Sequence, residues 1–182
     1  MFLSMLQERR SIRKFVARPI EGDKIARLVE AALRAPSSRG FNPWQFIVVT
    51  RPDVLRALAK AKPHGAAFLA DAPLGMVVCA DPGRSDVWVE DASIASAFIH
   101  VAALSLGLGS CWIQIRKRMY DEKKTASARV RDVLEIPEPL EVESIIAIGY
   151  PGETKPGHPR STLPYNQVHQ DRYGVAFPGP TV

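Results

Sequence analysis

The chain has 182 residues, of which 46% are apolar and 24% charged, values that suit one globular domain and argue against a disordered or fibrous protein. Neither cysteine belongs to a CxxC motif, which argues against a zinc ribbon and a secreted disulfide framework. No run of 18 apolar residues occurs, which argues against a membrane partner, and together these features predict a cytoplasmic protein. The net charge of +5 is concentrated in residues 1–18, with five basic residues against one acid, and in residues 116–131, with seven against two. Two separate basic stretches favour discrete anion sites over a nucleic-acid surface.

Hydrophobic spacing and turn residues predict alternating helices and strands through most of the chain. Helices are predicted at residues 19–35, 50–62, 86–106 and 126–134, and strands at residues 44–50, 74–80, 110–115 and 142–148. Thr50 is the expected N-cap of the second helix, with Asp53 at the capping-box position. The third helix is rich in alanine, which lets a second helix or a symmetry mate approach closely, so we expect it to be central.

The C-terminal segment, residues 151–182, differs in composition from the rest. It contains six prolines and four glycines, which oppose regular secondary structure. It also keeps apolar side chains, too many for a solvated linker, at Leu163, Tyr165, Val168, Tyr173 and Phe177. The sequence therefore predicts an extended arm that packs on its own domain or on a partner.

Two polar segments are candidate binding sites. Arg9, Arg10 and Arg13 surround a serine hydroxyl, and their guanidinium forks match phosphate oxygens, although a solvated charge run is the better interpretation of this segment alone. Residues 36–44 form a proline-bracketed loop whose hydroxyl, amide and guanidinium groups suit a polar ligand, and an ordinary helix-stop turn explains them equally well.

Signals for other chemistry are absent or misplaced. Gly107 and Gly109 resemble the start of a dinucleotide-binding motif, but Trp112 takes the third glycine position and the segment follows a helix. The four histidines form no pair with metal-ligand spacing and no GxSxG motif occurs, so neither a metal centre nor a hydrolase is predicted. Cys111 lies in an apolar strand, which favours packing over reactivity.

Five segments together are more specific than any one of them. They are residues 9–15 (RRSIRKF), 35–38 (APSS), 42–44 (NPW), 107–113 (GLGSCWI) and 145–160 (IIAIGYPGETKPGHPR), in that order. The set resembles the FMN-dependent nitroreductase family over nearly the whole chain. The resemblance implies an α+β fold with a mixed, mostly antiparallel sheet flanked by helices, built as an intertwined homodimer. Residues 1–160 would form one FMN-binding domain, and residues 161–182 an extended arm on the partner subunit.

The resemblance also implies which residues bind FMN. The candidates are Arg9, Arg10, Ser11, Arg13, Pro36, Ser37, Ser38, Gln114, Ile115, His158 and Arg160. The N-terminal members would hold the phosphate and the N1–C2 carbonyl edge of the ring, where Arg13 would tune the flavin, and the two C-terminal members would close on the phosphate. The serine loop would reach the flavin of the other chain, and the backbone N–H groups of Gln114 and Ile115 would meet flavin N5 and O4.

The implied activity is that of an oxidoreductase whose chemistry belongs to its cofactor. NADH or NADPH would deliver hydride to flavin N5, and a small electrophile such as a nitroaromatic or a quinone would take electrons in the same pocket, with ping-pong kinetics. Arg39, Phe41 and Trp88 are candidates to line that pocket. The alternatives are an FMN carrier or sensor without turnover and a basic nucleic-acid-binding module, which the lack of interleaved aromatic residues disfavours.

Overall fold

The computed structural model describes residues 2–178. The chain divides into two compact units. One comprises residues 10–155, and the other joins residues 1–9 to residues 156–182, so that the second unit is built from both ends of the chain.

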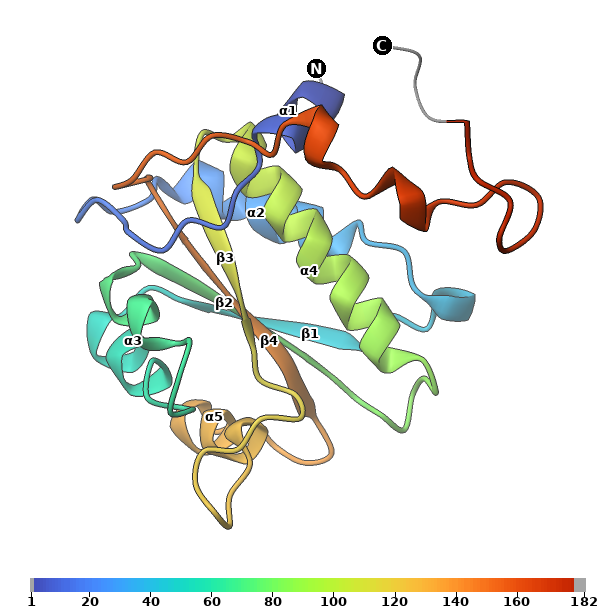
Figure 1. Ribbon diagram of the computed structural model, residues 1–182. Helices are drawn as coiled ribbons and strands as arrows, with labels where there is room; N and C mark the ends of the chain where they lie inside the picture. The colour runs from blue at the N-terminus through green and yellow to red at the C-terminus, as the bar shows by residue number, and fades with distance from the viewer. Residues whose placement is uncertain (1, 179–182) are drawn as a thin grey trace. The chain divides into compact units, whose positions relative to one another are not determined.

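A four-stranded sheet forms the centre of the larger unit (Figure 1). Its strands are β1 (Trp44–Val49), β2 (Leu74–Ala80), β3 (Gly109–Gln114) and β4 (Glu141–Gly149), in the order β1-β2-β4-β3. Every neighbouring pair is antiparallel, and an isolated parallel bridge joins Ser11 to Ser110 beside β3. The α+β fold and the mostly antiparallel sheet are therefore confirmed, and each predicted strand agrees with the structure to within one residue at either end.

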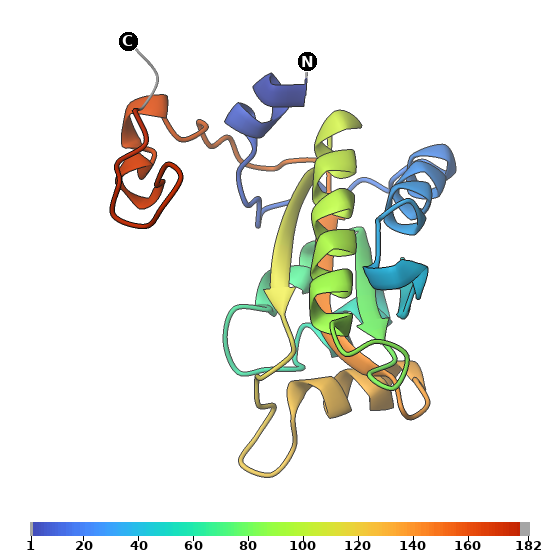
Figure 2. The same cartoon turned by 90° about the vertical axis from the view of Figure 1, so that its right-hand side faces the viewer.

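The apolar composition of β2 and β4 places them at the middle of the sheet. All seven residues of β2 are buried, because helices cover both faces of the sheet. On one face lie α3 (Pro52–Leu58) and α5 (Ala126–Leu134), and on the other lie α2 (Gly22–Leu33) and α4 (Trp88–Ser105) (Figure 2).

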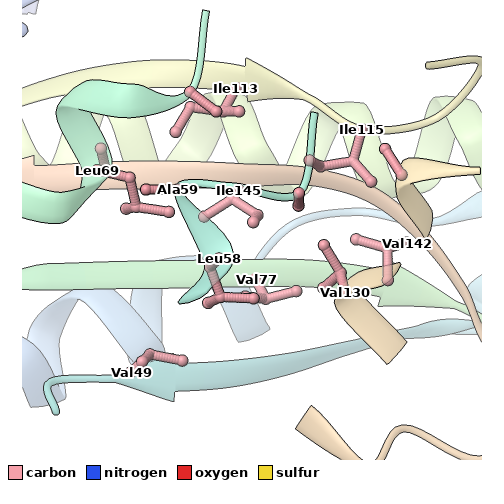
Figure 3. Packing of buried hydrophobic residues seen from close by; sticks show 14 of the residues in the cluster. Val49, Leu58, Ala59, Leu69, Val77, Ile113, Ile115, Val130, Val142 and Ile145 are labelled. Atoms are coloured by element: carbon pink, nitrogen blue, oxygen red, sulfur yellow. The ribbon is translucent and has the colours of Figure 1, made fainter. Parts of the chain in front are cut away.

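The face under α3 and α5 is packed with branched aliphatic side chains. Figure 3 shows Leu58 and Val130 from the two helices meeting Val77, Ile113 and Ile145 from three strands. Each of these five side chains is fully buried. Burial of a side chain of this size stabilises the fold by about 1.5–3 kcal/mol relative to exposure.

The face under α2 and α4 includes several small residues of the helices. Ala32 of α2 and Ala92, Ala95 and Ala103 of α4 are fully buried, and the two helices pack against each other. The sequence predicts that the alanine-rich helix packs on a second helix or on a symmetry mate, and within the chain it packs on a second helix, α2.

The N-terminus of α3 differs from the prediction. The helix begins at Pro52, Arg51 is its N-cap residue, and no side chain caps it. Proline fixes φ near the helical value and needs no hydrogen-bond partner for its nitrogen, so it starts a helix without a cap. The Asp53 carboxylate instead accepts hydrogen bonds from the Arg51 guanidinium, at 3.2 and 2.6 Å. The predicted cap at Thr50 and the predicted extension to residue 62 are therefore wrong.

The smaller unit contains α1 (Phe2–Glu8), which the sequence did not predict, and two short 3-10 turns, η3 (Arg160–Thr162) and η4 (Tyr165–Gln167). Gly157 lies against the Gln7 carbonyl, and a Cβ atom there would overlap it. None of residues 156–178 is buried, and apolar Leu163 and Phe177 are 44% and 45% exposed. Within the predicted arm, residues 179–182 lie outside the described residues, and its packing on a partner stays a prediction.

Candidate functional site

The ends of the chain form a basic pocket in the smaller unit. Its volume is about 840 Å³. The lining residues are Leu3, Leu6, Gln7, Arg9, His158, Arg160, Leu163 and Tyr165. Arg9 follows α1, to which its backbone N–H donates a hydrogen bond at Met5, and Arg160 begins η3. None of the ion pairs between residues 2–178 involves either arginine, so both charges are left for an anion.

This pocket suits a phosphate group. Two guanidinium groups give paired N–H donors in a plane, His158 adds a ring donor, and Tyr165 adds a hydroxyl. Arg9 is separated from His158 and Arg160 by almost the whole length of the chain, yet all three line one cavity. The residues that the sequence assigned to the phosphate therefore fit that group chemically.

In the larger unit, the backbone of residues 11–14 is held against β3 and the segment after β4. The Ile12 N–H donates to the Ser110 carbonyl at 3.1 Å. The Glu153 carboxylate accepts from the backbone N–H groups of Arg13 at 2.7 Å and Lys14 at 3.2 Å. Lys155 links the same carboxylate, at 2.9 Å, to the Ser11 carbonyl, at 3.2 Å.

The Glu153 carboxylate thus binds two backbone N–H groups and the Lys155 ammonium. The Arg13 N–H and the Lys155 ammonium are the main causes that lower the pKa of the Glu153 carboxyl to about 2. The backbone that presents Ser11 and Arg13 is therefore held by an ionised group throughout the physiological pH range.

The Arg13 side chain turns toward the face of the sheet that carries α3. Its guanidinium carbon lies 5.8 Å from the centroid of the Phe68 ring. Burial raises the pKa of the neighbouring Cys111 thiol, against the opposing effect of the Arg13 charge. Cys111 is therefore a protonated packing residue, as its apolar strand suggested. Arg10, the next candidate, is half-buried.

The free edge of β3 offers one of the two predicted backbone donors. The Ile115 N–H donates to the Glu143 carbonyl at 3.1 Å, so it is not free for a flavin, and this part of the prediction is corrected. Because edge-strand amides alternate in direction, the N–H of Gln114, which lies opposite Ser144, points away from β4. The Gln114 side chain is fixed by hydrogen bonds from Trp112 Nε1 at 2.9 Å and to the Arg116 carbonyl at 3.0 Å.

The serine loop is anchored to α4 through a buried carboxylate. Asp91, 2% exposed, accepts from the Ser38 N–H at 2.8 Å and from the Ser85 hydroxyl at 3.0 Å. The Ser37 hydroxyl donates to Asn42 Oδ1 at 2.7 Å and accepts from the Asn42 N–H at 2.9 Å. Sequence reasoning placed Asp91 in a helix but missed this role.

The predicted pocket-lining residues divide into two groups. Arg39 and Phe41 lie together at the tip of the loop, where the guanidinium carbon is 5.8 Å from the ring centroid and Arg39 has φ of 53°. Trp88 begins α4 and is covered by Arg116, at 5.5 Å. The described contacts thus join Trp88 to the end of β3, and they do not join it to the loop. Pro36, which precedes the serines, is exposed.

Glu143 is a second buried carboxyl group that the sequence reasoning missed. A β-bulge between Val78 and Cys79 in the pairing with β4 leaves Glu143 without a register partner. Its side chain is 4% exposed, and its Oε2 atom has no hydrogen-bond partner. Burial raises the pKa of this carboxyl, against hydrogen bonds with Gln114 and Ser93 and the charge of Arg116. The only sequence signal is one acid inside the apolar run VESIIAI.

Two further findings bear on the class of protein. Among residues 2–178, no three His, Cys, Asp or Glu side chains gather where they could hold a metal ion. Over the same residues, no helix combines the length and the apolar character that crossing a membrane requires.

The sequence matches the model of the nitroreductase family over residues 6–65 and 60–150. The chain belongs to the nitroreductase family. A relative from Archaeoglobus fulgidus, whose name refers to NADH dehydrogenase and NAD(P)H nitroreductase, is 39% identical over 157 residues, which cover 84% of this chain and 87% of the relative. The family predicted from the five ordered segments is confirmed.

Solved structures agree with this nitroreductase assignment. An FMN-dependent nitroreductase from Clostridium difficile is 44% identical and superimposes with a TM-score of 0.93 over 94% of this chain and 99% of the other. A more distant relative is the FMN reductase [NAD(P)H] of Bacillus subtilis, 28% identical over 194 residues, which cover 94% of this chain and 74% of that enzyme.

Proposed function

We propose that this nitroreductase is an FMN-dependent homodimeric oxidoreductase that takes hydride from NADH or NADPH and passes electrons to a small electrophile, a nitroaromatic or a quinone. The observation that carries the proposal is the pocket at which Arg9, His158 and Arg160 meet, because it suits a phosphate in a chain of this family. The names of the Clostridium difficile and Bacillus subtilis relatives support FMN and NAD(P)H as its cofactor and reductant. Its two free cysteines suit the reducing cytoplasm, where we place the enzyme.

The proposal assigns different parts of FMN to different residues. Arg9, His158 and Arg160 would bind the phosphate. Ser11 and Arg13, on the backbone fixed by Glu153, would meet the ring at its N1–C2 carbonyl edge, with Arg10 on the same segment. When bound, FMN supplies a ring nitrogen that accepts and donates hydride. A guanidinium at the N1–C2 edge stabilises negative charge there, and the outward N–H of Gln114 is the donor we assign to the opposite edge.

The homodimer is the second part of the proposal. Helix α4 exposes Ile94, Ala97 and Phe98 at helical spacing, with Ile94 39% and Phe98 40% exposed. Such a stripe suits the same stripe of a second copy, because burial of apolar surface drives association. We propose that residues 161–182 pack on the partner as an arm, beyond a domain of residues 1–160, and that residues 36–38 reach the flavin of the partner.

The visible spectrum of the purified protein tests the cofactor. We expect a yellow protein that releases FMN on denaturation, and a colourless protein that fails to bind added FMN would refute the proposal. The reaction is tested anaerobically, where NADH or NADPH should bleach the flavin bands and a nitroaromatic or quinone should restore them. Bound FMN that neither nucleotide reduces would instead identify a flavin carrier or sensor.

If both half-reactions use one pocket, initial rates at several acceptor concentrations should give parallel lines in double-reciprocal plots against NAD(P)H. Intersecting lines would overturn the ping-pong order. Sedimentation of the intact protein tests the dimer, and a well-folded monomer at micromolar concentration would contradict it.

A further inference from the structure

A cation held on an aromatic ring lies beside the end of β3. The guanidinium carbon of Arg116 is 5.5 Å from the centroid of the Trp88 ring, at the first residue of α4. Helix α4 and strand β3 lie side by side, as Figure 2 shows. Arg116 follows Gln114, whose N–H we assign to the flavin, by two residues, and the Gln114 side chain donates to the Arg116 carbonyl at 3.0 Å.

The backbone under this arginine is fixed. Both the Ile115 and the Arg116 N–H groups donate to the Glu143 carbonyl, at 3.1 and 3.0 Å. The direction in which the Arg116 side chain leaves the sheet is therefore set by the bulged residue of β4. The contact with the Trp88 ring further limits the side-chain freedom that Arg116 has left to lose when it binds a ligand.

Arg116 has no salt-bridge partner in the part of the chain that the structure describes. None of the ion pairs between residues 2–178 involves Arg116, Lys117 or Arg118. Burial raises the pKa of the buried Glu143 carboxyl, and the charge of Arg116 acts on it in the opposite direction. Asp91, on the first turns of α4, is already bonded to Ser38 and Ser85, which leaves Glu90 as the exposed acid there.

We propose that Arg116 and Trp88 make this nitroreductase selective for aromatic acceptors that carry a negative charge, such as a carboxylate on the reducible ring. The inference rests on the proposed function and names the substrate class of the same site. The Arg116 guanidinium matches a carboxylate with two parallel N–H donors, and the Trp88 ring beneath it holds the guanidinium in place.

The kinetic test compares two substrates that differ in charge at one position. For the FMN-loaded enzyme with saturating NADH, kcat/KM is measured for 4-nitrobenzoate and 4-nitrobenzamide. We expect Arg116→Met to lower the value for the benzoate about tenfold, in keeping with loss of a charge-assisted hydrogen bond, and to change that for the benzamide less than about twofold. Arg116→Lys should retain part of the preference, because it keeps the charge and loses the planar fork. Arg56→Met, an exposed arginine on α3, is the matched control and should change neither value.

A binding measurement decides the inference without turnover. Benzoate and benzamide, which the enzyme does not reduce, are titrated into the oxidised protein by calorimetry. We expect wild type to bind benzoate more tightly, a preference that weakens with added salt and is lost in Arg116→Met.

The outcomes distinguish failure of this inference from failure of the proposed function. Equal losses for both nitro compounds in Arg116→Met would show that the arginine only packs on Trp88, and the inference would be wrong. Equal binding of benzoate and benzamide to wild type would refute it as well. If the protein reduces neither nitro compound but still prefers benzoate through Arg116, the acceptor class of the proposed function fails while the anion site stands.

Discussion

Removal of the Asp91 carboxylate should release the serine loop from α4. Asp91 is 2% exposed and accepts two hydrogen bonds, one from the Ser38 backbone and one from the Ser85 hydroxyl. In Asp91→Ala, the Ser38 N–H and the Ser85 hydroxyl both lose the carboxylate that accepts their hydrogen bonds. The loop carries residues 36–38, which we propose reach the flavin, so the substitution links stability to the site.

The magnitude follows from these two contacts. A hydrogen bond to a charged group contributes about 1.5–3 kcal/mol, and the cost of burying the Asp91 carboxylate offsets part of the sum. We therefore expect Asp91→Ala to lower the free energy of unfolding by about 2–4 kcal/mol. Ser85→Ala, which removes one bond, should cost about 1–1.5 kcal/mol. Asp91→Asn keeps an oxygen for the Ser38 N–H and should cost about 1 kcal/mol.

Urea unfolding at one fixed protein concentration measures these differences. With a slope of about 2–3 kcal/mol per molar urea, Asp91→Ala should lower the midpoint by about 1 M. The double variant with Ser85→Ala should lose less than the sum of the single losses, because both changes remove the same bond. Glu90→Ala, which removes the exposed acid that precedes Asp91 in α4, is the control. A midpoint for Asp91→Ala no lower than that of Glu90→Ala would show that the carboxylate does not hold the loop.

Three further predictions concern other parts of the chain. Arg9→Ala and Arg160→Ala should each weaken FMN binding at least about tenfold. The double variant should weaken binding by less than the product of the two effects, because both arginines act on one phosphate. Unchanged affinity of either single variant in a fluorescence titration would show that this arginine does not bind the phosphate. Gly149→Ala should destabilise the protein by about 1–3 kcal/mol in urea unfolding, because its Cβ would lie 2.6 Å from Pro73 Cδ, and an unchanged midpoint would contradict this packing. The pKa of Glu153 is lowered from 4.5 to about 2, so its ionised form stabilises the fold above pH 4.5 and this contribution is lost as the pH falls through about 2. Wild type should therefore lose more stability than Glu153→Gln over that range, and parallel unfolding curves would show that the carboxylate makes no such contribution.

The strands and most helices could be predicted from local patterns. An apolar run such as LGMVVCA predicts a strand in a sheet covered on both faces, because such a strand needs apolar residues throughout. The start of α3 could not be predicted from a capping pattern, since Pro52 fixes the first turn without a cap. Helix α1 has seven residues and buries none of them, so periodicity gives no signal for it.

The candidate site likewise contains some residues that local sequence patterns predict and others that they do not. The arginine-rich segment and the family segments mark Arg9 and Arg160 directly. Asp91 and Glu143 are single acids in otherwise ordinary elements, and their roles depend on partners far along the chain. Asp91 needs the loop that precedes β1, and Glu143 needs a bulge in its pairing with β2. Neither the strand order nor the bulge is encoded in a local pattern, so neither role could be predicted.

The basic pocket is built from both ends of the polypeptide, and this affects when it can form. Arg9 is synthesised before any of the four strands, and His158 and Arg160 are synthesised after the last residue of β4. A nascent chain therefore holds one of the three basic residues of this pocket while all four strands are being made. The complete pocket can therefore form only after the sheet has been synthesised, and a chain truncated before residue 158 would keep all four strands but lack the C-terminal basic residues of this pocket.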